Sequence, residues 1–274
     1  MTKTPNSRRN LDIAIERAFG TGDNFLRTRT LIANTIVGQM LPSGVVKGGS
    51  SLKFRWGNEN ARFTNDLDTV RGTALTEFEE QMAELLEKGW HDFTGRLVAR
   101  APATPEGVPT QYVMQPFEVK LSYKGKAWLT VILEIGHDEI GDAYEPEYTI
   151  SESIVQIFSK IGLPSPAPMP CMALHHQISQ KLHGLSEENS SRAHDLIDLQ
   201  LIVKNENIDY AATRQACVRL FAYRNLQAWP PIIKKKENWG ELYDAQKNNL
   251  SVLDSVDESV VWTNKLIKRI DAVA

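Results

Sequence analysis

Five residues in one short segment have the types and the order that a phosphate and metal site needs. Gly48, Gly49 and Ser50 come first, and Asp66 and Asp68 follow after a short run with helical character. Glycines let a backbone turn sharply and approach a ligand, and the N–H groups at a helix start attract phosphate. Mg²⁺ needs only one or two carboxylates beside the phosphates of a substrate. The combination indicates phosphoryl or nucleotidyl transfer, in which positioning and charge neutralisation carry most of the catalysis.

The order of the predicted elements supports this interpretation more than either motif alone. The run "SSLKFRW" predicts a short helix opened by a serine cap, and "FTNDLDTV" predicts a strand. Alternate side chains of a strand share a face, so Asp66 and Asp68 are expected to point together while Leu67 turns into the core. The sequence contains no Gly-x-x-x-x-Gly-Lys-Ser/Thr loop, which disfavours a Walker-type NTPase.

A third carboxylate, Glu134, interrupts the apolar run "WLTVILEIG". A charge inside a buried strand is costly unless it is paired or bound to a metal. Glu134 is therefore either a third metal-facing carboxylate or the last residue of its strand, already in water. Both interpretations stay open.

The second half of the chain concentrates charged side chains between two predicted helices. Arg192, Asp195 and Asp198 are three residues apart, so they lie near one face if the segment is helical. Lys181 comes from the preceding predicted helix. Lys181 and Asp195 either hold phosphate oxygens and orient each other at a phosphate site, or form an ordinary ion pair between two helices.

The elements that must position these residues follow from hydrophobic periodicity and from breakers. Residues 10–40 have apolar positions at helical spacing, interrupted by "GTGD", and predict two helices. The other elements predicted for the first part are a strand at 45–46, an amphipathic helix at 75–90, an exposed proline-rich loop at 99–110 and strands at 112–123 and 127–136.

From about residue 151 the pattern becomes helical, with a proline-rich linker at 162–170. We therefore predict the fold class α+β. A small mixed-sheet domain with N-terminal helices is expected in residues 1–160, and a helical domain in residues 161–274.

Composition narrows the function classes. The chain has 31 basic and 34 acidic residues and a net charge of −3, so a nucleic acid would have to bind a local basic patch. The best candidates are the runs at 234–236 and 265–269. Two cysteines are too few for a disulfide framework or a zinc cluster. The absence of a signal core or a long apolar stretch favours a cytoplasmic protein without a membrane partner.

The combined motifs resemble the AbiEii family of nucleotidyltransferase toxins, a branch of the DNA-polymerase-β-like superfamily. The run "VVKGGSSLKFRWGNENARFTNDLDTV" is similar to the family's Gly-Gly-Ser/Thr turn followed by Arg-Phe-Ser/Thr-x-Asp-Leu-Asp. The runs "LTVILEIGHDE", "QISQKLHGL", "SRAHDLIDLQLI" and "LFAYRNLQAWP" resemble its later motifs, so that the likeness spans roughly residues 10–239. The chain has Glu134, Gln180 and His194 where the family usually has Asp, Glu and Lys.

The resemblance implies a function and a set of site residues. The function is Mg²⁺-dependent transfer of a nucleotide from an NTP to RNA, with tRNA 3′ ends as the acceptor in characterised relatives, and with a two-metal site as one option. A cognate antitoxin is the implied partner in a toxin–antitoxin or phage-defence system. The implied catalytic residues are Asp66, Asp68, Lys181 and Asp195; the nucleotide-binding residues are Gly48, Gly49, Ser50, Arg62, Arg192 and Asp198; the metal ligands are Asp66, Asp68 and Glu134.

Two rival classes use the same phosphate and metal chemistry. One is a kinase or a protein nucleotidylyltransferase that modifies a partner protein. The other is a nucleotide-binding module without catalysis, against which the intact Asp66 and Asp68 argue. The destination of a labelled nucleotide distinguishes all three.

Overall fold

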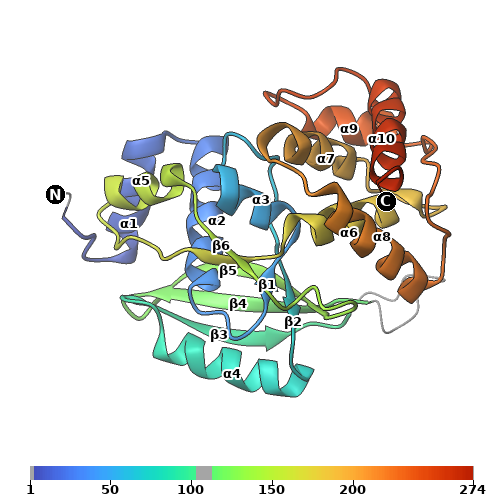
Figure 1. The fold of residues 1–274 in the computed structure, drawn as a ribbon. Helices are drawn as coiled ribbons and strands as arrows, with labels where there is room; N and C mark the ends of the chain where they lie inside the picture. The colour runs from blue at the N-terminus through green and yellow to red at the C-terminus, as the bar shows by residue number, and fades with distance from the viewer. Residues whose placement is uncertain (1–2, 103–112, 274) are drawn as a thin grey trace. The chain divides into compact units, whose positions relative to one another are not determined.

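The computed structural model describes residues 3–102 and 113–273 (Figure 1). Contacts divide the chain into two compact units. The first comprises the chain up to Asn58 together with Phe63–Asp138 and Ala143–Cys171. The second comprises Glu59–Arg62, Glu139–Asp142 and the chain from Met172 onward, so two short segments of the first half belong to the second unit.

The first unit contains a mixed sheet, with seven strands among the described residues, in the order β3-β4-β5-β2-β1-β7-β6. The pairs β2–β5 and β1–β7 are parallel, and the other neighbours are antiparallel. The pairing places β2 directly beside β5, although β3 and β4 separate them along the chain. The strands are β1 (Val45–Val46), β2 (Leu67–Arg71), β3 (Phe93–Ala99), β4 (Gln115–Tyr123), β5 (Lys126–His137), β6 (Glu147–Thr149) and β7 (Met169–Cys171).

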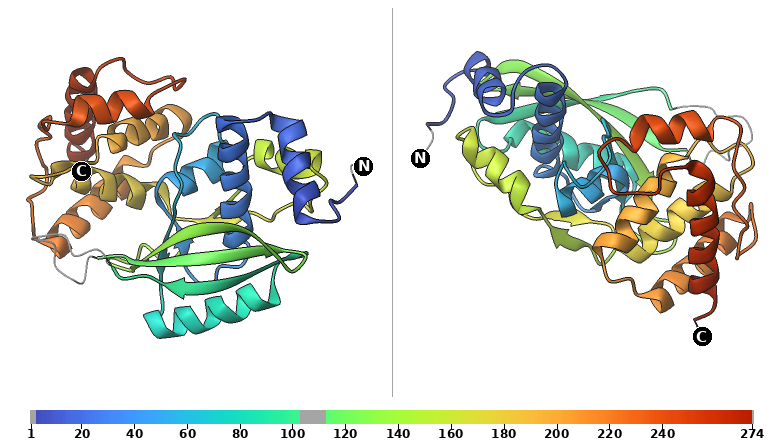
Figure 2. Two further views of the ribbon diagram at one scale, coloured as in Figure 1. Left: turned by 180° about the vertical axis from the view of Figure 1, so that it is seen from behind. Right: turned by 90° about the horizontal axis from the view of Figure 1, so that it is seen from above.

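Helices cover both faces of this sheet. In Figures 1 and 2, α4 lies on one face, and α1, α2 and α5 lie on the other. The buried face of α4 carries Phe78, Met82 and Leu86, which share one hydrophobic core with Leu31 and Ile32 of α2. The helices of the first unit are α1 (Arg8–Phe19), α2 (Asp23–Gly38), α3 (Gly48–Trp56), α4 (Leu75–Lys88) and α5 (Glu152–Lys160).

The second unit is helical. A hydrogen bond from the Ala212 N–H to the Asp209 side chain caps α8, and Ser255 and Glu258 form a capping box at the start of α10. The predicted helices are present, but Arg192 precedes its helix instead of lying on it. The helices are α6 (Leu174–Ser186), α7 (His194–Asn205), α8 (Tyr210–Arg224), α9 (Trp239–Gln246) and α10 (Val256–Asp271).

The predicted class, a mixed-sheet α+β part followed by a helical part, is confirmed. The N-terminal helices and the amphipathic helix after the two aspartates form as predicted. The helical character expected from residue 151 is only partly right, because α5 is followed by β7, which pairs with β1. Most of the predicted proline-rich loop, residues 103–110, lies outside the described residues.

The division by contacts falls between Cys171 and Met172, after the strand that follows the proline-rich segment. The domain bounds 1–160 and 161–274 stay a prediction. In the part of the chain that the structure describes, no helix is long and apolar enough to cross a membrane.

Candidate active site

The Gly-rich turn leads directly into α3, which begins at Gly48. Gly48 has φ +63, a left-handed conformation that suits glycine. The predicted serine cap is wrong, because Lys47 is the N-cap residue and no side chain caps this helix. Ser50 lies inside the first turn, and its hydroxyl donates to the backbone carbonyl of Asp66 at 2.7 Å. The serine therefore links the turn to the segment that carries the aspartates.

The two aspartates lie at the start of β2. The strand begins at Leu67, so Asp66 immediately precedes it and Asp68 is its second residue. Leu67 is fully buried while both aspartates are partly exposed, as strand alternation predicts. The Lys47 N–H donates to the Asp68 carbonyl at 2.8 Å. A Cβ on Gly48 would lie 2.4 Å from Asp68 Oδ2, so the glycine allows the carboxylate to lie against the turn.

Glu134 lies inside β5, which continues to His137. The alternative in which Glu134 ends its strand is therefore wrong. In the parallel pairing of β2 with β5, Glu134 is the register partner of Asp68. Burial, followed by the negative charges of Asp68 and Asp66, raises the pKa of Glu134 above its ordinary value, and Lys47 partly opposes the rise. The three carboxylates predicted from sequence, Asp66, Asp68 and Glu134, are thus close enough for their charges to interact. We call these three residues the acidic neighbourhood.

Lys47 also lies close enough to Glu134 for their charges to interact, and sequence reasoning missed this lysine. Its ammonium lies 3.5 Å from the position that a Cβ on Gly136 would occupy, two residues beyond Glu134 on β5. The only feature that could have indicated Lys47 is its position directly before the Gly-Gly turn. Its proximity to Glu134 could not be predicted, because long-range strand pairing places β5 beside β2.

The carboxylates suit a cation whose remaining ligands come from a bound substrate. Among the described residues, no three His, Cys, Asp or Glu side chains converge closely enough to hold a metal ion by themselves. Asp66 and Asp68 supply hard carboxylate oxygens at one end of the strand, and Lys47 only partly offsets the unfavourable charge of Glu134. One or two carboxylates plus phosphate oxygens match the preference of Mg²⁺, so the donor set fits this ion.

The second unit contains a buried ion cluster. Lys181 on α6 donates through its ammonium to Asp195 Oδ1 at 2.8 Å and to Asp198 Oδ2 at 2.6 Å, and all three side chains are buried. Arg62 Nε contacts the two carboxylate oxygens of Asp198 at 3.0 and 3.1 Å. Arg192 Nε donates to Asp195 Oδ2 at 2.6 Å. Lys181, Arg192, Asp195 and Asp198, which the sequence analysis grouped together, are therefore in contact. Arg62, from the first half of the chain, also contacts this cluster.

The cations of this cluster keep both aspartates ionised. Burial alone would raise the pKa of Asp195, but Arg192 and Lys181 outweigh it and hold the pKa well below its ordinary value. The pKa of Asp198 is lowered in the same way, with burial opposed mainly by Arg62 and Lys181. Each buried carboxylate is thus compensated by two cations.

His194 lies at the edge of the cluster and is neutral near pH 7. Burial is the main cause that lowers its pKa to about 4; Asp195 and Asp198 oppose the shift, and Arg62 and Arg192 add to it. The unfolded chain takes up this proton near pH 6.5. We therefore expect the free energy of unfolding to decrease by about 3 kcal/mol as the pH falls from about 6.5 to about 4.

The test is urea unfolding across this pH range for the natural chain and for His194→Gln, whose side chain does not titrate. The variant is expected to lose this part of the pH dependence. An unchanged slope in the variant would assign the dependence to other groups.

The second unit also contains polar contacts that sequence did not predict. Arg224 pairs with Glu139, with Nε and Nη2 at 3.0 and 3.2 Å from the carboxylate oxygens. Gln180 donates to Asp142 Oδ2 at 2.6 Å. Glu139 and Asp142 belong to a four-residue segment just after β5, and only the tertiary structure places this segment beside α6 and α8 within the unit.

Comparison with solved structures shows which known fold this chain resembles. MenT4, a nucleotidyltransferase toxin from Mycobacterium tuberculosis H37Rv, is similar with a TM-score of 0.56 and 16% identity over 94% of this chain and 97% of that chain. JHP933 from Helicobacter pylori has a TM-score of 0.42 and 15% identity over 91% and 92% of the two chains. The likeness to MenT4 shows a nucleotidyltransferase toxin fold.

A family model completes the identification. The model for the nucleotidyl transferase AbiEii toxin of type IV toxin–antitoxin systems matches residues 37–262. The chain therefore belongs to the AbiEii family of nucleotidyltransferase toxins, which confirms the resemblance seen in the motifs. No curated protein matches the chain.

Proposed function

We propose that this protein transfers a nucleotide from an NTP to RNA in an Mg²⁺-dependent reaction, with a tRNA 3′ end as the acceptor. One observation carries the proposal. Asp68 lies against the Gly48 turn and opposite Glu134 of β5, so acidic oxygens and the N-terminus of α3 occur side by side. Family membership supports a nucleotidyltransferase, and this juxtaposition supports the NTP phosphates and a cation as ligands.

The residues of the first unit have distinct proposed roles. Gly49 and Ser50 hold the β- and γ-phosphates through N–H groups in the first turn of α3. Asp66 and Asp68 hold Mg²⁺, with Glu134 assisting. When bound, the ion neutralises charge on the phosphates and orients the α-phosphate. Gly48 lets the Asp68 carboxylate lie close to the turn.

The remaining site residues are proposed to position the reactants. Lys181 and Asp195 orient the triphosphate and the incoming hydroxyl, and Arg62, Arg192 and Asp198 bind the nucleotide or hold these groups in place. The acceptor 3′-oxygen forms a bond to the α-phosphorus, the bond to pyrophosphate breaks, and the hydroxyl proton passes to solvent.

The family's type IV toxin–antitoxin description implies an antitoxin partner, which we propose controls this activity. A role in phage defence belongs to the same proposal, and it is tested by expressing the chain with its neighbouring genes during infection.

The decisive experiment separates the acceptors and the transferred group. The protein, Mg²⁺ and each NTP, labelled in turn on the α- or γ-phosphate, are incubated with total RNA and with bacterial proteins. We expect α-label on RNA. A γ-label on any acceptor would indicate a kinase, and an α-label on protein would indicate a protein nucleotidylyltransferase. The absence of any transfer would favour a nucleotide-binding module without catalysis.

Gly48→Ala is expected to lower the transfer rate about 10²-fold, because the new Cβ would displace the Asp68 carboxylate and small misplacements of reacting groups cost this much. Gly125→Ala is the matched control. Gly125 also has positive φ (+73), but a Cβ there meets nothing within 4 Å. Single-turnover labelling rates compare the two. Equal losses in both variants would assign the effect to backbone strain.

Glu134→Gln is expected to cut transfer at least about tenfold and to raise the Mg²⁺ concentration needed for half-maximal rate, because an amide is a poor ligand for a hard cation. Glu118→Gln on the neighbouring strand β4 is the control, since Glu118 pairs with Lys120. A Glu134→Gln protein with unchanged rate and Mg²⁺ dependence would remove Glu134 from the metal site.

A further inference from the structure

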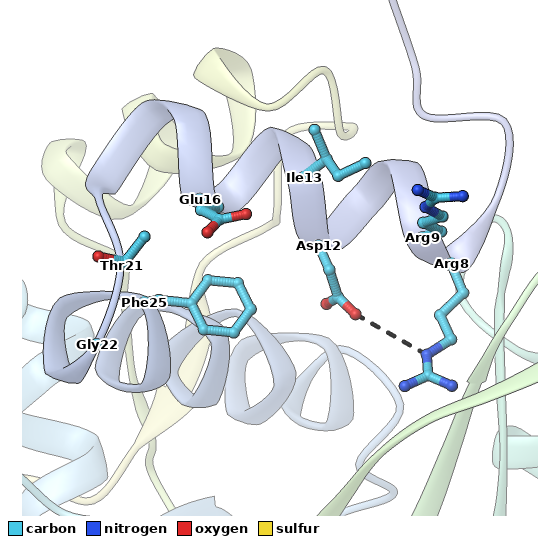
Figure 3. Close-up of a pocket in the computed structure, with 8 residues that line it drawn as sticks. All are labelled: Arg8, Arg9, Asp12, Ile13, Glu16, Thr21, Gly22 and Phe25. Carbon is cyan, nitrogen blue, oxygen red and sulfur yellow. Dashed lines mark ion pairs between the residues drawn. The ribbon is translucent and has the colours of Figure 1, made fainter.

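Two cavities flank helix α1, and their charges differ. The first, of about 390 Å³, is lined by Arg8 and Arg9 but also by Asp12 and Glu16 (Figure 3). Asp12 is already engaged, because it accepts from Arg29 Nε at 2.9 Å and lies 3.8 Å from Arg8 Nε. The charges in this cavity therefore largely compensate one another.

The second cavity, of about 550 Å³, lies against another face of α1 and is basic. Lys3, Arg17 and Lys160 line it, and the described residues around it include no carboxylate. The three cations are exposed, and none of them forms an ion pair within the described part of the chain, although the Lys160 ammonium lies 5.7 Å from the centroid of the Phe19 ring. Their positive charge thus remains available to an anion, although the whole chain has a net charge of −3.

The segment that carries Lys3 is held in place. The Pro5 carbonyl accepts from the hydroxyl of buried Tyr123 on β4 at 2.5 Å. Ser7 caps α1 by accepting from the Asn10 N–H at 3.2 Å. Lys3 is therefore tied near Arg17, in the last turn of α1, and near Lys160, in the last turn of α5.

We propose that this basic cavity binds backbone phosphates of the acceptor RNA. The inference rests on the proposed function, because it assumes that RNA is the acceptor. Lys and Arg contacts to phosphates supply the sequence-independent part of nucleic-acid affinity, and polar side chains such as Thr4, Asn6 and Asn10 can add contacts to phosphate or sugar oxygens.

The lining favours a nucleic-acid backbone over a nucleotide. A bound Mg²⁺–triphosphate needs carboxylates for its ion, and the described lining residues include none. Base recognition commonly uses aromatic stacking, and no aromatic side chain is among them. Spaced cations with no aromatic side chain among the lining residues suit a chain of phosphates.

The test measures binding of a short fluorescent single-stranded RNA, and of unfractionated tRNA, to the full chain at several salt concentrations. The double variant Arg17→Gln with Lys160→Gln is expected to bind both RNAs about tenfold more weakly. Its slope of log affinity against log salt should be shallower by about 0.7 to 1 for each RNA phosphate that is no longer neutralised. Its melting temperature and its apparent KM for NTP should stay unchanged.

The control double variant is Arg9→Gln with Lys88→Gln. It removes the same charge: Arg9 is on the same helix but lines the compensated cavity, and Lys88 is the last-turn cation of α4. The control should bind RNA like the natural chain. Equal RNA affinity and salt slope in all three proteins, or equal weakening in both variants, would overturn the inference. The proposed function would still stand in that case if the natural chain labels RNA. A natural chain that neither binds nor labels RNA would overturn both.

Discussion

Asp66→Ala and Asp68→Ala are each expected to abolish nucleotide transfer, with a loss of at least about 10²-fold, while the protein stays folded. Loss of a group that stabilises developing charge typically has an effect of this size. Asp68 lies against the Gly48 turn and is the register partner of Glu134. Its carboxylate therefore lies between the proposed phosphate-binding turn and the third carboxylate.

Stability provides an independent check on this prediction. The charges of Asp68 and Asp66 raise the pKa of Glu134, which means that the ionised carboxylates repel one another. Without Mg²⁺, either substitution should therefore leave the melting temperature unchanged or slightly higher, and should bring the pKa of Glu134 closer to its ordinary value. The measurements are label incorporation, thermal unfolding without metal, and titration of Glu134 by NMR.

Asp92→Ala is the matched control for the aspartates. Asp92 belongs to the same unit and pairs with Lys124 at 2.8 Å on the surface, and it has no role in the proposed site. It should keep full activity. Undiminished transfer by Asp66→Ala or Asp68→Ala would refute the metal-holding role.

Lys181→Met is expected to lower the free energy of unfolding by about 3–5 kcal/mol, because it leaves Asp195 and Asp198 buried without their shared cation. Lys235→Met is the control in the same unit. Lys235 also pairs with a carboxylate, Asp257, at 2.8 Å, but both side chains are exposed, so the loss of this pair should change stability little. Urea unfolding measures both. Equal, small effects would mean that the cluster is not buried in solution.

The same burial decides how a catalytic role can be tested. A charge reversal at Lys181 and Asp195 would place a carboxylate beside Asp198 and an ammonium beside Arg192, so it should fail structurally whatever the role. Lys181→Arg keeps the charge. If Lys181 contacts the triphosphate, this variant should lose rate at a temperature where it is fully folded. Full activity there would leave the lysine a purely structural role.

Sequence alone determined the local features of this protein. Alternation along a strand predicted that Asp66 and Asp68 flank a buried Leu67, and the spacing of three placed Asp195 and Asp198 on one helical face. These features depend on neighbours a few residues apart, whose geometry is set by the backbone repeat. Boundaries were less accurate: the serine cap was wrong because α3 begins at Gly48, before either serine, with Lys47 as its N-cap residue. Helix α9 lies in the part predicted to be helical, but its own signal in the sequence is weak, because only Trp239 and Tyr243 mark its buried face.

Only the tertiary structure decided which distant residues meet. Glu134 faces Asp68 because β5 pairs with β2 out of chain order, and sequence left its position between a strand end and a strand interior. Arg62 reaches Asp198 across 136 positions of sequence, and Lys47 joins the acidic neighbourhood by the same strand pairing. Such contacts come from burying shared apolar faces and pairing strand edges. The periodicity of a segment shows which of its faces is buried, but it does not specify which distant segment packs or pairs there.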